Sequence, residues 1–189
     1  MGLTTFTLGE SNSLLQSTKG NRWKPEKGKY RISILNYEED ENGSPIFSKD
    51  GAPTAPQIQG LRRCYHKDIG YFQDKGPEFV KIAGSPSKPA FVFTVCFWPV
   101  DPVGSLDAAR LQRGDFEVKN WILSKDKISQ IVAIHKEFPT SEHDINITVQ
   151  DATFHKMSFT PCKDNLYKAL AQKEENALYT QLRETYKIV

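Results

Sequence analysis

A change of hydrophobic period between residues 117 and 138 constrains the fold more than any other feature of this chain. Residues 117–123 alternate strictly, as expected for a β-strand, whereas the apolar residues after Ser124 follow a helical period. Serine favours the N-cap of a helix, and Pro139 marks its end. The sequence therefore predicts a strand that runs directly into a helix, whose apolar face consists of Ile128, Ile131, Val132 and His135.

The predicted strand carries a cation and an indole on one face. Lys119 and Trp121 are two residues apart, so their side chains point the same way in an extended strand. Such a pair can hold a phosphate and stack a nucleobase with a single surface. The alternative is that Trp121 is a core aromatic and Lys119 is a solvated edge residue, and the sequence leaves both interpretations open.

Other segments predict further strands and a second helix. Alternating or apolar runs near residues 30–35, 58–65, 90–100, 145–150 and 154–160 indicate strands, and 163–186 indicates one amphipathic helix. Segment 90–100 is apolar on both faces, with Phe93 on one face and Trp98 on the other, and either face could be core. Segment 38–56 is expected to be a loop or a loose hairpin around Asn42-Gly43, and segment 101–114 is expected to be a loop.

These elements predict a mainly β, α+β fold. Five or six strands around an inserted helix favour a small, partly open barrel of the OB type, followed by a C-terminal helix. We expect a flexible arm over residues 1–22, a nucleic-acid-binding core over 23–162 and the C-terminal helix over 163–189.

Composition narrows the class of protein. The chain has 189 residues, a net charge of +2 and 38% hydrophobic residues, which is typical of one soluble domain. Its longest apolar runs are far shorter than the roughly 20 residues that span a bilayer, and the N-terminus lacks the pattern of a secretory signal. We therefore expect a cytoplasmic protein with no membrane partner. The odd number of cysteines indicates reduced thiols at Cys64, Cys96 and Cys162.

Positive charge is concentrated in residues 1–35 and 61–90, whereas residues 36–60 are acidic. Segment 62–67, RRCYHK, interleaves cations with aromatic rings, and Tyr71 and Phe72 follow shortly after it. Stacking of bases on such rings contributes about 1–3 kcal/mol per base and tolerates any base sequence. This segment is the strongest candidate for nucleic-acid binding, and the alternative is a solvated basic strand edge with Tyr65 and Phe72 half-buried.

Three segments taken together resemble a known family. They are residues 23–35 (WKPEKGKYRISIL), 117–132 (EVKNWILSKDKISQIV) and 144–162 (DINITVQDATFHKMSFTPC). In the same order they resemble the single-stranded DNA-binding proteins of tailed bacteriophages, of the helix-destabilising OB-fold type. The resemblance implies a groove of aromatic and basic side chains along one strand of DNA. It assigns stacking to Trp121 and basic positions to Arg31 and Lys88.

The chain departs from that family in two places. Some members hold a zinc ion with a cysteine and histidine cluster, whereas this region offers only Cys64 and His66, so we expect no metal. The chain also ends in YKIV without an acidic tail, so recruitment of partners through such a tail is not expected.

Catalytic patterns are sparse. The sequence has no phosphate-binding Gly-Lys loop and no nucleophile elbow, and His135 is expected to be a satisfied core histidine. A metal-dependent nuclease would need Asp101, Asp144 and Asp151 to converge on one site. A second alternative is a structural or adaptor barrel that binds another protein and uses the basic segment as ordinary surface.

We therefore expect a non-enzymatic protein without cofactors that binds single-stranded DNA with little sequence preference during replication or recombination. If the chain is phage-encoded, its place is the host cytoplasm. Binding to RNA, self-association and contacts with replication proteins stay open. Phosphate contacts are expected from Lys29, Arg31, Arg62, Arg63, Lys67, Lys88 and Lys119, and base stacking from Tyr65, Tyr71, Phe72 and Trp121.

Overall fold

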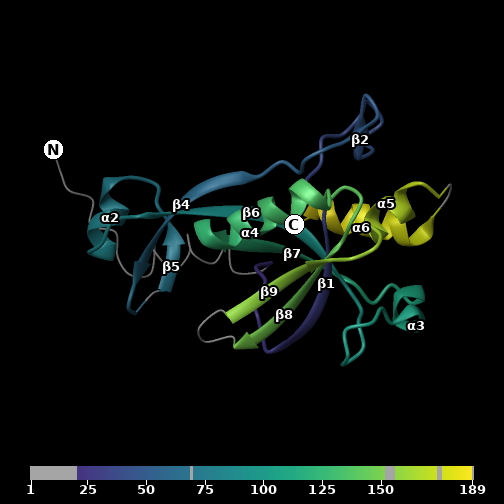
Figure 1. Cartoon of the computed structure of the whole chain (residues 1–189). Coiled ribbons are helices and arrows are strands. Elements are labelled where there is room, and N and C mark those ends of the chain that lie inside the picture. Colours follow the sequence, from purple (N-terminus) through teal and green to yellow (C-terminus); the bar gives the residue numbers. More distant parts are fainter. Residues whose placement is uncertain (1–20, 69, 152–155, 174–175, 189) are drawn as a thin grey trace.

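The computed structural model describes residues 21–68, 70–151, 156–173 and 176–188, and its main feature is a seven-stranded antiparallel sheet (Figure 1). The strand order is β5-β4-β6-β1-β8-β9, and β7 pairs with the other edge of β6. A separate hairpin joins β2 (Ser48–Lys49) to β3 (Ala52–Pro53). The strands of the large sheet are β1 (Gly28–Ile34), β4 (Gln59–His66), β5 (Gly70–Gln73), β6 (Lys88–Trp98), β7 (Glu117–Ser124), β8 (Ile145–Asp151) and β9 (Lys156–Pro161).

The long strand β6 joins two parts of the molecule. Its first half pairs with β4, where Lys88 lies opposite Arg63, and its second half pairs with β1, where Val95 lies opposite Ile34. Because β4 and β1 share one edge of β6, the β4–β5 hairpin extends away from the remaining strands. We call β4, β5 and helix α2 (Pro77–Ala83) the lobe; it projects to one side in Figure 1.

Strands β1, β6, β7, β8 and β9 form a partly open barrel. Helix α4 (Lys125–Glu137) follows β7 directly and contacts both β7 and β9, where the described strands make no backbone pairing with each other. The rings of Trp121 on β7 and Phe159 on β9 lie 5.5 Å apart and close this gap from inside. The predicted mainly β, α+β fold and the predicted change from strand to helix at Ser124 are confirmed.

Two hydrophobic cores lie on opposite faces of β6. Phe93 and Val95 belong to the core inside the barrel, whereas Cys96 and Trp98 belong to a second core beneath the C-terminal helices. Both faces of this strand are therefore buried, which explains why segment 90–100 is apolar throughout. All three cysteines are free thiols, and Cys96 is fully buried, as expected for core filling.

The C-terminal segment forms two helices, so the prediction of one helix over 163–186 was wrong. Asn165 Oδ1 accepts a hydrogen bond from Lys168 N at the start of α5 (Leu166–Ala171). Asn176 Oδ1 accepts from Leu178 N and Tyr179 N at the start of α6 (Ala177–Ile188). The second asparagine starts a new helix because it satisfies backbone donors that a continuous helix would have used internally.

Short elements within predicted loops and turns escaped the sequence patterns. Helix α2 begins at Pro77, which suits the first turn of a helix, and α3 (Ala108–Gln112) interrupts the loop expected over 101–114. Nearly all of the arm expected over residues 1–22 lies outside the described residues, as do residues 154 and 155 of the last predicted strand. None of the helices in the described part of the chain has both the length and the apolar character needed to cross a bilayer.

Candidate nucleic-acid interface

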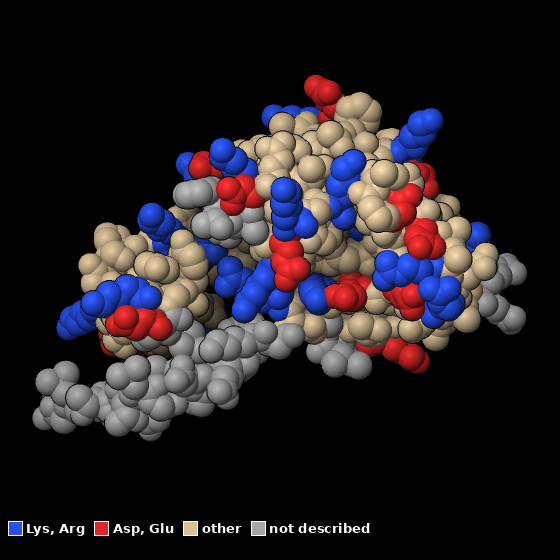
Figure 2. All heavy atoms as spheres, turned by 90° about the horizontal axis from the view of Figure 1, so that it is seen from below, with Lys and Arg blue, Asp and Glu red and all other residues tan. Residues whose placement is uncertain are grey.

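A pocket of about 300 Å³ lies between the lobe and the barrel. It brings together three of the side chains that the sequence singled out, namely Arg63, Tyr71 and Trp121. Figure 2 shows Lys and Arg side chains gathered where the lobe meets the barrel. The residues that line the pocket are Arg22, Trp23, Pro25, Arg63, Tyr71, Trp121, Ile122, Leu123, Ser124, Lys127 and Met157.

The lobe contributes a cation and an exposed aromatic ring, Arg63 and Tyr71, to this pocket, and Tyr65 lies beside Tyr71. Tyr65 and Tyr71 are cross-strand partners on β4 and β5, and their ring centres lie 5.0 Å apart. The guanidinium of Arg63 lies 4.3 Å from the centre of the Tyr71 ring. Tyr65 is 50% exposed and Tyr71 is 45% exposed, so both rings offer a face to a ligand. This surface can hold a phosphate and stack a base side by side.

The barrel contributes Arg22 and an indole that is part of the core. Trp23 N donates a hydrogen bond to Asn120 O over 2.9 Å, so the segment before β1 runs beside β7 and places Arg22 at the pocket. Trp121 is only 2% exposed and packs edge-on against Trp23. The prediction that Trp121 is an open stacking platform was therefore wrong, and its alternative as a core aromatic is confirmed.

The positive charge of the two arginines in the pocket is not compensated by any carboxylate among the described residues. Burial and the charge of Arg63 lower the pKa of Arg22, and burial lowers the pKa of Arg63 as well. Among the described residues, no carboxylate forms an ion pair with either guanidinium. The Nε atom of Arg63 is buried and has no hydrogen-bond partner among the described residues. An anion in the pocket would compensate the positive charge of both guanidinium groups.

The start of α4 extends the pocket into a groove. Lys127 Nζ donates to Met157 O over 3.2 Å and lies 5.6 Å from the centre of the Phe159 ring. A neighbouring hollow shares Ser124, Lys127 and Met157 with the pocket and continues to Lys156 at the start of β9. Positive side chains therefore follow one path from the lobe across the start of α4 to β9.

Arg31 does not belong to this surface, and its predicted phosphate contact was wrong. Its Nε lies 2.8 Å from Asp144 Oδ2, and one of its terminal nitrogens lies 3.1 Å from Asp164 Oδ1. The Arg31 side chain is only 12% exposed. Two carboxylates therefore already occupy its donors, and the guanidinium links β1 to the start of β8 and to the segment before α5.

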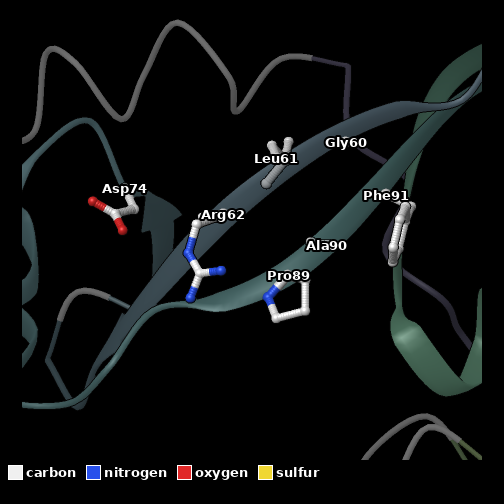
Figure 3. A pocket seen from close by; sticks show the side chains of 7 residues that line it. All are labelled: Gly60, Leu61, Arg62, Asp74, Pro89, Ala90 and Phe91. Atoms are coloured by element: carbon white, nitrogen blue, oxygen red, sulfur yellow. The ribbon is translucent and has the colours of Figure 1, made fainter.

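Arg62 and Phe72 lie on the opposite face of the lobe from Arg63 and Tyr71. Arg62 Nε donates to Ser87 Oγ over 2.8 Å, and Figure 3 shows its side chain in an open hollow between Asp74 and Pro89. The ring of Phe72 packs against Phe79 of α2 at 6.3 Å between centres. The predicted stacking on Phe72 does not fit this placement, because its ring packs within the lobe. Arg62 is exposed but lies on the face away from the pocket, and its predicted phosphate contact stays a prediction.

Four predicted lysines divide into two groups. Lys67 and Lys88 are exposed on the lobe side, and Lys88 lies opposite Arg63 in the sheet register. Lys29 Nζ donates to Val103 O over 2.9 Å in the loop before α3, and Lys119 pairs with Glu117. The first pair can extend the surface around Arg63, whereas the structure does not bring the second pair to the pocket.

The metal-dependent nuclease alternative gains no metal site among the described residues. In this part of the chain, no three histidine, cysteine or acidic side chains group as metal ligands, so Asp101, Asp144 and Asp151 do not converge. Asp101 Oδ1 accepts from the backbone of its own turn, at Ser105 N and Val103 N. His135 is half-buried and satisfied, because its Nδ1 bonds with Thr140.

Sequence patterns missed Arg22 and Lys127. Arg22 directly precedes the first core residue, Trp23. It is the last residue of the expected flexible arm, so sequence patterns did not mark it as a site residue. Lys127 lies three residues after the N-cap Ser124, so its place in the first turn of α4 could have been predicted from the helix start. Nothing in the sequence reveals that either residue faces the lobe.

Comparison of the chain with models of protein families, with curated proteins and with solved structures finds no match.

Proposed function

We propose that this protein binds single-stranded nucleic acid, and DNA in particular, with little sequence preference and without catalysis. The observation that carries the proposal is the pocket between the lobe and the barrel. There two arginines without carboxylate partners among the described residues meet a tyrosine ring that is 45% exposed. Cations attract the phosphate backbone, and exposed rings stack bases of any identity.

Single-stranded substrates fit this surface better than duplex. Tyr65 and Tyr71 offer ring faces, and a base can stack on them only when it has left its own stack with neighbouring bases. The Arg63 side chain beside Tyr71 supplies a phosphate contact at the same place. A duplex would present its phosphates to the same cations but would hide the faces of its bases, so it should bind more weakly.

The connectivity of the barrel supports the same proposal. We assign it to the OB type: β1, β6 and β7 pair in succession, α4 follows, and β8 and β9 form the closing hairpin. OB folds bind oligonucleotides on their second and third strands and on the loops between strands one and two and between strands four and five. In this chain these are β6, β7, the insertion that contains the lobe, and the β8–β9 connection. The pocket borders the lobe, β7 and β9.

The resemblance to phage single-stranded DNA-binding proteins suggests the biological setting. Such a protein would coat and protect exposed strands during replication or recombination, in the cytoplasm of the host if the gene belongs to a phage. The groove that continues past Lys127 to Lys156 gives the strand a path across the start of α4.

Fluorescence anisotropy with labelled oligonucleotides tests the proposal. At low salt, a labelled oligo-dT should bind much more tightly than a duplex of the same length, and oligo-rU measures the preference for DNA. Equal affinity for single strand and duplex would contradict the role given to the tyrosines. Absence of binding to all three would refute the proposal and favour the adaptor alternative.

A further inference from the structure

We propose that Arg22 and Arg63 form a phosphate-binding subsite that links the lobe to the barrel, and that the phosphate belongs to a nucleotide whose base packs on Tyr71. The assignment of the base rests on the proposed function, whereas the anion site itself does not. Arg22 precedes the strand segment that bonds to β7, and Arg63 lies on β4. An anion held by both would therefore connect two separate parts of the fold.

Two other half-buried arginines of this protein have carboxylate partners that compensate their charge. Arg31 pairs with Asp144 and Asp164, and Arg183 pairs with Glu39 and donates to Tyr167 Oη over 2.9 Å. Burial opposes the charge of each, yet the adjacent carboxylates raise the pKa of both. A buried guanidinium is therefore paired wherever the fold needs it for structure.

Arg22 and Arg63 depart from that pattern together. Burial lowers the pKa of both, and the charge of Arg63 lowers the pKa of Arg22 further, so the two guanidinium groups repel each other. None of the described residues that line the pocket is acidic. The Nε of Arg63 is buried and has no acceptor among the described residues, so the side chain is not held by a structural partner of the kind that Arg31 and Arg183 have.

The chemistry of the pocket favours a nucleotide phosphate over the carboxylate of a bound protein segment. A guanidinium matches phosphate oxygens with two parallel N–H donors, and two guanidinium groups can share one tetrahedral anion. Apart from Ser124 and Lys127, the rest of the wall is apolar or aromatic, with Trp23, Ile122 and Met157 among its residues. A nucleotide offers both parts in one ligand, because its charged phosphate adjoins a flat base.

Inorganic phosphate is the first probe, with the intact protein and with chloride at equal ionic strength as the reference. Phosphate should raise the melting temperature of the wild type. Arg22→Gln and Arg63→Gln should abolish this shift, whereas Arg113→Gln should preserve it, because Arg113 pairs with Asp115 on the exposed α3 end. Without phosphate, both pocket variants should melt at or above the wild-type temperature, since each removes a repulsion.

Oligonucleotide arms identify the source of the phosphate. Each glutamine variant should weaken oligo-dT binding about 10-fold or more and reduce the salt slope by about one. Oligo-dT with a neutral methylphosphonate backbone should bind the wild type and both variants equally weakly. A preference for oligo-dT carrying a 5′-phosphate, lost in the variants, would assign the site to a strand end rather than to an internal linkage.

The outcomes separate this subsite from the proposed function. If the variants bind oligo-dT with the wild-type salt slope and keep the phosphate shift, the subsite is refuted while single-strand binding stands. If phosphate stabilises the wild type through these arginines but oligo-dT does not bind, the function is refuted and the subsite stands. A large loss of thermal stability in phosphate-free buffer for both glutamine variants and for Arg63→Lys would show a structural role instead.

Discussion

Tyr71 and Phe72 are adjacent in the sequence, yet their rings lie on opposite faces of β5. Tyr71 lies beside Arg63 at the pocket, whereas Phe72 packs against α2. We expect Tyr71→Ala to weaken binding of oligo-dT by about 1–3 kcal/mol, because it removes a stacking surface. Equilibrium titration with labelled oligo-dT measures this loss.

Two variants control for that substitution. Tyr71→Phe keeps the ring and should retain most of the affinity, and Phe72→Leu keeps an apolar side chain against α2 and should leave affinity unchanged. If Phe72→Leu weakens binding as much as Tyr71→Ala, the assignment of the two faces of the lobe is wrong.

Asp144 makes the stability of the fold depend on pH. It accepts hydrogen bonds from Arg31, Ser33 and Leu166 N. Burial raises the pKa of Asp144 to about 6, although Arg31 opposes the shift. Since the pKa of an unfolded aspartate is about 3.9, the folded state binds this proton more tightly. The contribution to the free energy of unfolding is therefore fully present below about pH 4 and is lost as pH rises through about 6.

Asp144→Asn isolates this term, because its side chain does not titrate. The free energy of unfolding of the wild type, relative to that of the variant, should fall by about 2 kcal/mol between pH 4 and pH 7. Urea denaturation of both proteins across this range measures the difference. A difference that is constant with pH, or that grows as pH rises, would contradict the raised pKa.

At the scale of single residues, the sequence shows which residue types gather in a segment, but it does not show which partners their side chains meet. The interleaved cations and rings of segment 62–67 lie at β4 of the lobe, where strand alternation separates Arg62 from Arg63, and their role in binding stays a prediction. The sequence could not reveal that a carboxylate neutralises Arg31, because the partner, Asp144, lies 113 residues away in the chain. Long-range pairs of this kind have no local signal.

At the scale of elements, the two ends of α4 differ in their surroundings. Lys127 in its first turn lines the pocket, whereas Lys136 in its last turn is exposed at the opposite end. We expect Lys127→Gln to reduce the salt slope of oligo-dT binding by about one and to weaken binding at low salt. The same titration with Lys136→Gln should give the wild-type slope; an equal effect of both would indicate a diffuse rather than a localised contact.

The C-terminal helix α6 is an integral part of the fold. Leu182 is fully buried in the second core, near Tyr167 of α5. We expect Leu182→Ala to lower the free energy of unfolding by about 2–5 kcal/mol, because it leaves a cavity in a packed core. Chemical denaturation measures this, and the exposed Glu184→Ala on the same helix should change stability by at most about 0.5 kcal/mol. A negligible effect of Leu182→Ala would mean that α6 is not docked in solution.

Long periodic segments were predictable, and short ones were not. The change of period at Ser124 and the apolar run of β6 fixed the strand, the helix and the central strand correctly. Strand β5 has four residues and α2 has seven, too few for either period to be recognised. These two elements complete the lobe together with β4, so the candidate site could not be assembled from the sequence alone.

At the scale of the whole molecule, the distribution of charge matters more than its sum. A net charge of +2 gives little attraction to a polyanion. Arg22, Arg63, Lys127 and Lys156 nevertheless follow one path across the pocket and the adjoining groove. These cations lie close together, where the lobe meets the barrel. We therefore expect the affinity for oligo-dT to fall steeply with salt, although the protein as a whole is nearly neutral.

The most direct test of this account is quenching of tryptophan fluorescence by unlabelled oligo-dT over a series of salt concentrations. Trp23 and Trp121 line the pocket, whereas Trp98 lies in the second core, so Trp98→Phe should preserve the quenching. We predict strong quenching, a logarithmic salt slope of about −3 from the four cations and a much smaller response to duplex. Quenching that is absent at low salt, or insensitive to salt, would contradict the central claim.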